Sequence, residues 1–196
     1  MPGGRPVTDR PDTVRAFVAL EIPDRVRDIL RREQKALKAE LPRARWTRPE
    51  GQHLTLKFLG ETPTHRLSGI VRAIAAEARG LAAVEVELSG AGFFPDPRRP
   101  RVAWLGGSAD GGPEVAAAVE RAAVSSDVPA DRRPWSLHLT QARIDRGWPR
   151  SAVERFLEWG RTVRIGGFSC PEIVLFRSDL RPGGAVYTAL DRVSLG

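Results

Sequence analysis

Runs of apolar residues with strand or helix periodicity divide the first half of the chain into four elements. Residues 14–22 and 53–59 are rich in β-branched, aromatic and leucine residues, and each run ends at a proline or glycine, which predicts two strands. Between them, residues 24–40 repeat apolar side chains at helical spacing, with Asp24 as the expected N-cap. A second helix is predicted over residues 63–79.

The second half mixes short strands and helices in the same way. A proline-rich loop is expected at residues 95–100, a second loop at 106–112, and a tight connection at 181–184. Strands are predicted at 84–89, 102–105, 137–142, 163–168, 173–178 and 186–190, and helices at 113–124 and 151–159. Because this order lacks the regular alternation of a doubly wound parallel sheet, the predicted fold class is α+β with mainly antiparallel sheets.

The distribution of these elements also predicts an internal duplication. Each half supplies a similar set of strands and about two helices, as expected for two similar lobes facing each other across a cleft. Residues 1–13, which are polar and contain prolines, are expected to form a flexible tail, and residues 14–196 a single domain.

Composition narrows the class of protein and its partners. No segment approaches the ~20 apolar residues that span a bilayer, and residues 1–10 lack the core of a signal peptide, so we expect a cytoplasmic protein. The single cysteine, Cys170, excludes an internal disulfide and is interpreted as a packing residue. The net charge of +7 favours a polyanionic partner such as RNA or a nucleotide. The alternative is a set of arginines spread over a solvated surface.

Two of the three histidines begin the same triplet, His53-Leu54-Thr55 and His138-Leu139-Thr140. Residues two apart on a strand point to one face, so each triplet should present an imidazole and a hydroxyl together. Two proton-transfer groups and two small donors are the set needed to hold and cleave a phosphodiester. A single such triplet is more often a half-buried pair in a sheet, and the repetition favours catalysis.

Other catalytic chemistries lack their residues. Outside the triplets the only histidine is His65, interpreted as a surface residue, and there is neither a His-Glu-x-x-His run nor a second cysteine. We therefore predict no metal and no cofactor. The chain also lacks a phosphate-binding Gly-x-x-x-x-Gly-Lys-Ser/Thr run and a Gly-x-Ser-x-Gly elbow, which argues against nucleotide-driven ligation and serine hydrolysis.

The segments around both triplets resemble a known family. Arg45-Trp46 followed by residues 53–60 (HLTLKFLG), and residues 138–143 (HLTQAR), are similar to the two-histidine (2H) phosphoesterases, specifically the bacterial and archaeal RNA 2′,3′-cyclic phosphodiesterases once called 2′-5′ RNA ligases. Residues 15–20, 94–98 and 178–187 extend the resemblance over most of the chain. Gln141 departs from it, since the family more often has an apolar residue there, and should point away from His138 and Thr140.

The resemblance implies a bilobal fold in which two antiparallel sheets face a central cleft, with helices outside and no metal. It implies hydrolysis of a 2′,3′-cyclic phosphate to a 2′-phosphate end, with His53 as proton donor and His138 as proton acceptor. The residues alone permit the reverse assignment. Thr55 and Thr140 should donate hydrogen bonds to the non-bridging oxygens, and Arg143 should stabilise their charge unless it is only a strand-end surface cation.

Substrate contacts are less specific in the sequence. Trp46, Phe17 and Tyr187 are candidates to stack on a base, with a core role as the alternative for each. Exposed arginines are candidates to guide an RNA backbone, or simply to be solvated: Arg48, Arg98, Arg99 and Arg101.

We expect the protein to be a monomer. Two other functions remain open from the sequence. One is a non-catalytic module of the same fold that binds RNA or nucleotides. The other is the same machinery acting on a different phosphodiester, such as a 2′-5′ linkage or an ADP-ribose-derived cyclic phosphate.

Overall fold

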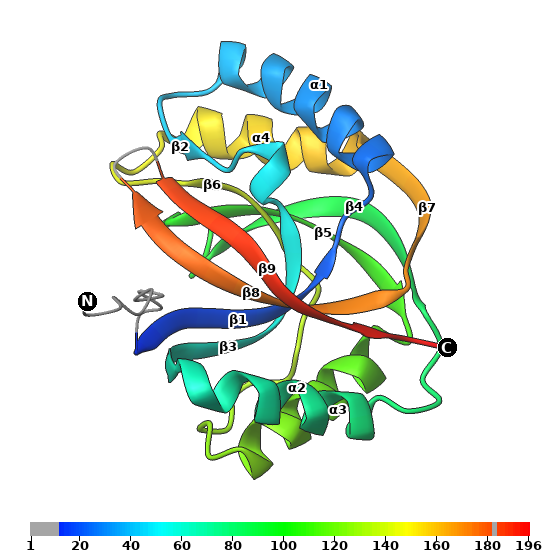
Figure 1. Cartoon of the computed structure of the whole chain (residues 1–196). Helices are drawn as coiled ribbons and strands as arrows, with labels where there is room; N and C mark the ends of the chain where they lie inside the picture. Colours follow the sequence, from blue (N-terminus) through cyan, green and yellow to red (C-terminus); the bar gives the residue numbers. More distant parts are fainter. Residues whose placement is uncertain (1–11, 182–183) are drawn as a thin grey trace, which may run out of the picture.

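The computed structural model describes residues 12–181 and 184–196, which form two antiparallel sheets (Figure 1). The first sheet has the strand order β3-β1-β8-β9. Its strands are β1 (Thr13–Glu21), β3 (His53–Pro63), β8 (Glu172–Arg181) and β9 (Gly184–Ser194). β1 and β8, which lie far apart in the sequence, pair in its centre.

The second sheet has the order β2-β6-β5-β4-β7. Its strands are β2 (Arg45–Trp46), β4 (Val84–Phe94), β5 (Val102–Asp110), β6 (Leu139–Arg143) and β7 (Arg164–Cys170). Every pairing in both sheets is antiparallel. The predicted α+β class with antiparallel sheets is confirmed.

Helices cover the two sheets from opposite ends of the molecule (Figure 1). At one end lie α1 (Asp24–Glu40) and α4 (Arg150–Thr162), joined by a hydrogen bond of 2.8 Å from Trp159 Nε1 to Glu33. At the other end α2 (Leu67–Glu77) packs beside α3 (Gly112–Ser125). The 3₁₀ turns η1 (Pro49–Gly51) and η2 (Thr64–Arg66) precede β3 and α2. No helix in the described part of the chain is long and apolar enough to span a membrane.

The prediction of a loop at residues 106–112 was wrong, because β4 and β5 form a hairpin longer than the apolar pattern indicates. β5 continues through Gly106 and Gly107 to Asp110. A Cβ atom on Gly92 in β4 would lie 2.2 Å from the Trp104 ring, and one on Gly107 would lie 2.0 Å from a backbone oxygen. These glycines are strand residues that let a neighbour approach closely, so they do not mark a turn.

Other boundaries shift by a few residues. The helix predicted from residue 63 begins as η2 and continues as α2 from Leu67, because β3 runs on to Pro63. Asp24 is the first helical residue, and Pro23 occupies the N-cap without a side-chain hydrogen bond. The tail predicted at residues 1–13 lies outside the described residues except for Asp12 and Thr13, and Thr13 already belongs to β1.

Two apolar clusters organise the interior. The large one joins the helices to the inner faces of both sheets. The small one lies on the other face of the first sheet and contains Phe17, Ala19, Val174 and Phe176, with Tyr187 packed against it. His53, the first of the two motif histidines, packs against this small cluster.

Candidate functional site

The two triplets are built on the same backbone plan. Over residues 53–58 and again over 138–143, the side chains run half-buried, buried, half-buried, buried, buried and exposed. Two adjacent buried residues, 56–57 in one segment and 141–142 in the other, break strict alternation. A strand buried on one face should expose every other residue. Both strands therefore contain an irregularity after the threonine.

A β-bulge explains that irregularity in both strands. In β3, Thr55 pairs with Ala19 and Lys57 with Val18, which leaves Leu56 as an extra residue. In β6, Thr140 pairs with Trp104 and Ala142 with Ala103, which leaves Gln141 extra. An extra residue reverses the alternation that follows it and re-aims the next side chains.

The bulges define one face on each strand, which we call the histidine face. On β3 it carries His53 and Thr55, and beyond the bulge the exposed Phe58. On the second strand it carries Thr140 and the exposed Arg143, with His138 directly before the first strand residue. β3 and β6 belong to different sheets, yet their Cα atoms approach within 8 Å.

Both imidazoles are oriented by the same hydrogen bond. His53 Nδ1 lies 2.9 Å from the carbonyl oxygen of Gly51, and His138 Nδ1 lies 2.9 Å from that of Ser136. Because a carbonyl only accepts, Nδ1 carries the proton and donates it in each case. The neutral ring therefore keeps Nε2 as its acceptor, ready to take a proton from a reacting group.

An aromatic shell surrounds His53. Its ring centroid lies 4.5 Å from that of Phe17, 4.9 Å from the edge-on ring of Tyr187 and 6.1 Å from that of Phe176. Burial in this shell lowers the pKa of His53 to about 4; the nearby His138 adds to the lowering and the Gly51 hydrogen bond opposes it. His53 is thus neutral in the free protein at neutral pH.

His138 has a thinner aromatic surround. Its ring lies 5.1 Å from the edge-on ring of Phe94, which is itself 5.4 Å from Trp104 and 38% exposed. One aromatic wall replaces the three that enclose His53. The two histidines therefore share an orientation but differ in environment.

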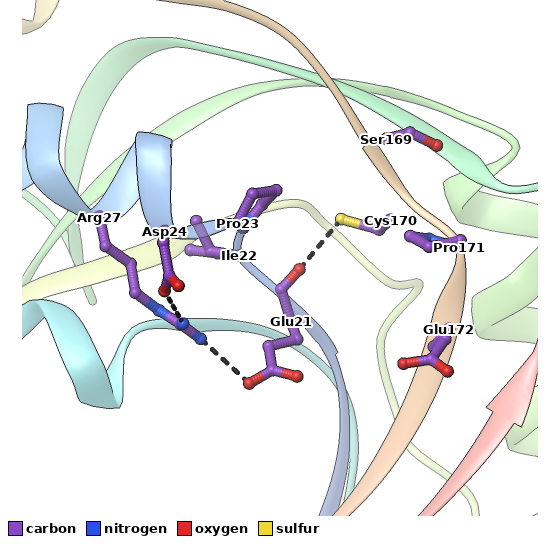
Figure 2. Close-up of a pocket in the computed structure, with 9 residues that line it drawn as sticks. All are labelled: Glu21, Ile22, Pro23, Asp24, Arg27, Ser169, Cys170, Pro171 and Glu172. Atoms are coloured by element: carbon purple, nitrogen blue, oxygen red, sulfur yellow. Dashed lines mark hydrogen bonds and ion pairs between the residues drawn. The ribbon is translucent and has the colours of Figure 1, made fainter.

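A small pocket of about 140 Å³ opens beside His53 and is also lined by Gly51, Phe176 and Tyr187. A larger one of about 330 Å³ adjoins it through Glu21 and Arg27 and contains neither histidine (Figure 2). As Figure 2 shows, Arg27 in this pocket pairs with two carboxylates, Asp24 at 2.7 Å and Glu21 at 3.1 Å. Of these two pockets, the smaller one contacts the candidate site, through His53, and neither is lined by His138, Thr55 or Thr140.

Comparisons with known proteins found similar chains over most of the sequence. Residues 20–104 match the family model described as LigT like Phosphoesterase. An RNA 2′,3′-cyclic phosphodiesterase of Methanothermobacter thermautotrophicus is 32% identical over 91% of this chain and 97% of its own length. This chain belongs to the LigT-like phosphoesterase family.

Further similarities extend along nearly all of this LigT-like phosphoesterase. An RNA 2′,3′-cyclic phosphodiesterase of Thermus thermophilus is 33% identical over 93% of this chain and 90% of its own length. The crystal structure of TT0787 from Thermus thermophilus superposes with a TM-score of 0.77 at 30% identity, covering 92% of this chain and 97% of that one. The fold and the family are therefore shared over nearly all of the chain.

The structure brings two of the three predicted stacking residues of this LigT-like phosphoesterase to His53. Phe17 is 3% exposed and stacks on Phe176 at 5.2 Å, so it supports the imidazole from below the surface. Tyr187 is half-buried with its ring edge against both Phe17 and His53. Trp46 lies elsewhere, with its ring 6.3 Å from that of Trp148.

Phe58 is the residue that sequence reasoning missed. It is 59% exposed, the most exposed phenylalanine among the large apolar side chains, and its ring lies 6.1 Å from that of Phe17. It is the fifth residue after His53, as Arg143 is the fifth after His138. That shared spacing was visible in the sequence, but its meaning depends on the bulges.

Gln141 is absorbed by a buried network of three glutamines. Its side-chain oxygen accepts hydrogen bonds of 3.2 Å from Gln34 on α1 and from Gln52, the residue before His53. It therefore points away from the histidine face of the LigT-like site. Gln141, the residue that departs from the family pattern, thus links β6 to the residue before β3 on the side opposite the histidine face.

Of the remaining sequence candidates, Cys170 is buried and the others are exposed. Burial raises the pKa of the Cys170 thiol to about 12, with a smaller contribution from Glu85, so the group is protonated at neutral pH. In residues 12–181 and 184–196 no three His, Cys, Asp or Glu side chains are grouped to hold a metal ion. The other sequence candidates are exposed: His65, Arg48, Arg98, Arg99 and Arg101.

Proposed function

We propose that this LigT-like phosphoesterase hydrolyses the 2′,3′-cyclic phosphodiester of RNA or a nucleoside to a 2′-phosphate end without a metal ion. The observation that carries the proposal is the pair of imidazoles held in one tautomer, each with a threonine on its own face of the site. The names of the relatives support the same reaction. A binding module would need neither the second imidazole nor its matched orientation.

The reaction needs a water aligned opposite the leaving oxygen, a base and an acid. His138 accepts the proton of the water at Nε2 while the water oxygen bonds to phosphorus. The bond from phosphorus to the 3′ oxygen breaks, and His53 gives its Nε2 proton to that oxygen. The product is a 2′-phosphate, and the proton on His138 returns to solvent.

His53 must be protonated when the substrate is bound, although it is neutral in the free protein. The negative charge of the cyclic phosphate offsets the burial that disfavours the imidazolium. Substrate binding is therefore coupled to proton uptake at His53. Thr55 and Thr140 donate hydrogen bonds to the non-bridging oxygens, and the exposed Arg143 faces the charge that develops there.

The bulge positions orient the rest of the substrate. Phe58 offers an exposed ring beside the shell of His53, and an aromatic face stacks on any base. Arg143 offers a cation at the equivalent position on the histidine face of β6. In this arrangement the base lies against Phe58 and Arg143 lies on the phosphate side.

The test uses nucleoside 2′,3′-cyclic phosphates and an oligonucleotide with a cyclic phosphate end, in buffer containing EDTA. We expect turnover to 2′-phosphate alone, and a loss of at least about 10²-fold in kcat for His53→Ala and for His138→Ala. His65→Ala removes an exposed imidazole and serves as the control. Normal turnover by His138→Ala would contradict the proposal, as would binding without any hydrolysis.

An aryl phosphodiester separates the acid from the base. A nitrophenolate leaves without a proton, so a variant that lacks only the acid keeps much of its activity on that substrate. We expect His53→Ala to be rescued more than His138→Ala. The opposite order would reverse the two roles.

A further inference from the structure

Lys57 is a buried lysine two residues after Thr55 in β3. Its side chain is 1% exposed, and it follows Thr55 across the bulge on the side away from the histidine face. A buried ammonium is costly unless every one of its protons is bonded. Here three acceptors surround it: Glu120 Oε2 at 2.7 Å, the Pro129 carbonyl oxygen at 2.8 Å and Asp131 Oδ1 at 3.1 Å.

These acceptors lie on α3 and on the segment that leads to the second histidine. We call residues 126–138 the α3–β6 loop. Asp131 and Pro129 belong to it, and the Asp131 amide also donates to Glu120 Oε1 at 2.7 Å. Lys57 therefore ties the strand of the first triplet to the loop that ends at His138.

A second contact ties the same loop to the same strand. Trp135 Nε1 donates a hydrogen bond of 2.8 Å to the carbonyl oxygen of Thr55. Its ring packs over the start of α3, where a Cβ on Gly112 would lie 2.9 Å from it. Trp135 is three residues before His138, so this tie acts close to the imidazole.

The loop has little backbone structure of its own. Within the described ranges, no backbone-to-backbone hydrogen bond holds residues 129–136, and neither a helix nor a strand includes them. Its position is set by side-chain contacts. Ala142 occupies in β6 the place that Lys57 has in β3. The second motif strand therefore has no matching lysine, and this contact is made by β3 alone.

We propose that Lys57, assisted by Trp135, is a positioning residue that sets the distance between the two His-Thr pairs. The proposal rests on the proposed function, because the two pairs must hold one phosphate between them. Proton transfer and in-line attack depend on that distance, and a displacement of about 1 Å far from the chemistry can cost 10²-fold in rate.

Lys57→Met tests the tie because it keeps the apolar stem and removes the ammonium. The side chains left behind, Glu120 and Asp131, are 31% and 56% exposed and can be hydrated. We expect kcat to fall by about 10²-fold while KM changes much less. We also expect the loop amide of Asp131, which donates to the Lys57 partner Glu120, to exchange hydrogen at least about tenfold faster. Arg121→Met is the matched control, because it breaks an α3 ion pair of 2.7 Å with Glu77 that does not involve the loop.

A purely structural role for Lys57 gives a different result. A lower Tm with wild-type kcat and wild-type loop exchange in Lys57→Met overturns the proposal. If that variant does not fold, Asp131→Asn and Trp135→Phe each weaken one contact between β3 and the α3–β6 loop from the loop side. Wild-type kcat and wild-type loop exchange in both of these variants would equally overturn the proposal. If the wild-type protein turns over no cyclic phosphate, the proposed function fails, while loop exchange still decides whether Lys57 positions the loop.

Discussion

Lowering the pH from 6.5 towards 4 should destabilise this protein through one histidine. The pKa of His53 is about 4 in the folded protein, against 6.5 as its ordinary value. Between these two values the unfolded chain binds a proton that the folded chain does not, so the free energy of unfolding falls as the pH falls. Each pH unit of this window is worth ~1.4 kcal/mol, and the whole window is worth on the order of 3 kcal/mol. The neutral His53 contributes this stability in full above pH 6.5, and the contribution is lost as the pH falls to about 4.

The assay is urea unfolding followed by tryptophan fluorescence between about pH 4.5 and 7.5, for wild type and His53→Asn. The asparagine amide does not titrate and can still donate to the Gly51 carbonyl. We expect the wild-type free energy of unfolding to drop by on the order of 3 kcal/mol more than that of the variant. Carboxylates with lowered pKa values, such as Glu21 and Glu120, titrate in both proteins and cancel. Parallel curves for the two proteins would refute the reasoning, and His65→Asn should follow the wild type.

Three further outcomes follow from the same contacts. Phe58→Ala should raise KM for nucleoside cyclic phosphates about tenfold or more in steady-state kinetics. The KM for a ribose cyclic phosphate that has no base should not change. Gly160→Ala should lower the free energy of unfolding by about 1–3 kcal/mol, since its Cβ would meet Ala91 at 2.3 Å, whereas Gly166→Ala meets open space. Iodoacetamide at about pH 8 should leave the buried Cys170 unmodified until urea unfolds the chain, as mass spectrometry would detect.

The elements that were predictable are those with long apolar periodicity. α1 was predicted at its observed bounds because its buried residues repeat at helical spacing over 17 residues. The end of the β4–β5 hairpin was not predicted, because Gly106 and Gly107 carry no hydropathy signal. Their place in a strand is decided by Trp104 and by the backbone of the paired strand.

The candidate site divides in the same way. The triplets were visible because a repeated His-x-Thr needs no partner to be recognised. Which residues share their face was visible only as far as Thr55 and Thr140, since each bulge depends on the register of a neighbouring strand. Phe58 was therefore missed. Trp46 was favoured on its segment alone, although its ring packs in the second sheet.

The backbone of the site is symmetric and its side chains are not, and under the proposed function this combination suits an unsymmetrical substrate. Two equivalent lobes would accept a cyclic phosphodiester in either of two orientations, and the two histidines would then exchange roles. Unlike residues at matched positions remove that equivalence: Phe58 lies where the other strand has Arg143, and Lys57 where it has Ala142. Three aromatic rings enclose His53, whereas one contacts His138. In the proposed reaction the enclosed imidazole gains its proton only with a bound anion, so the asymmetry that would orient the substrate would also decide when the acid is charged.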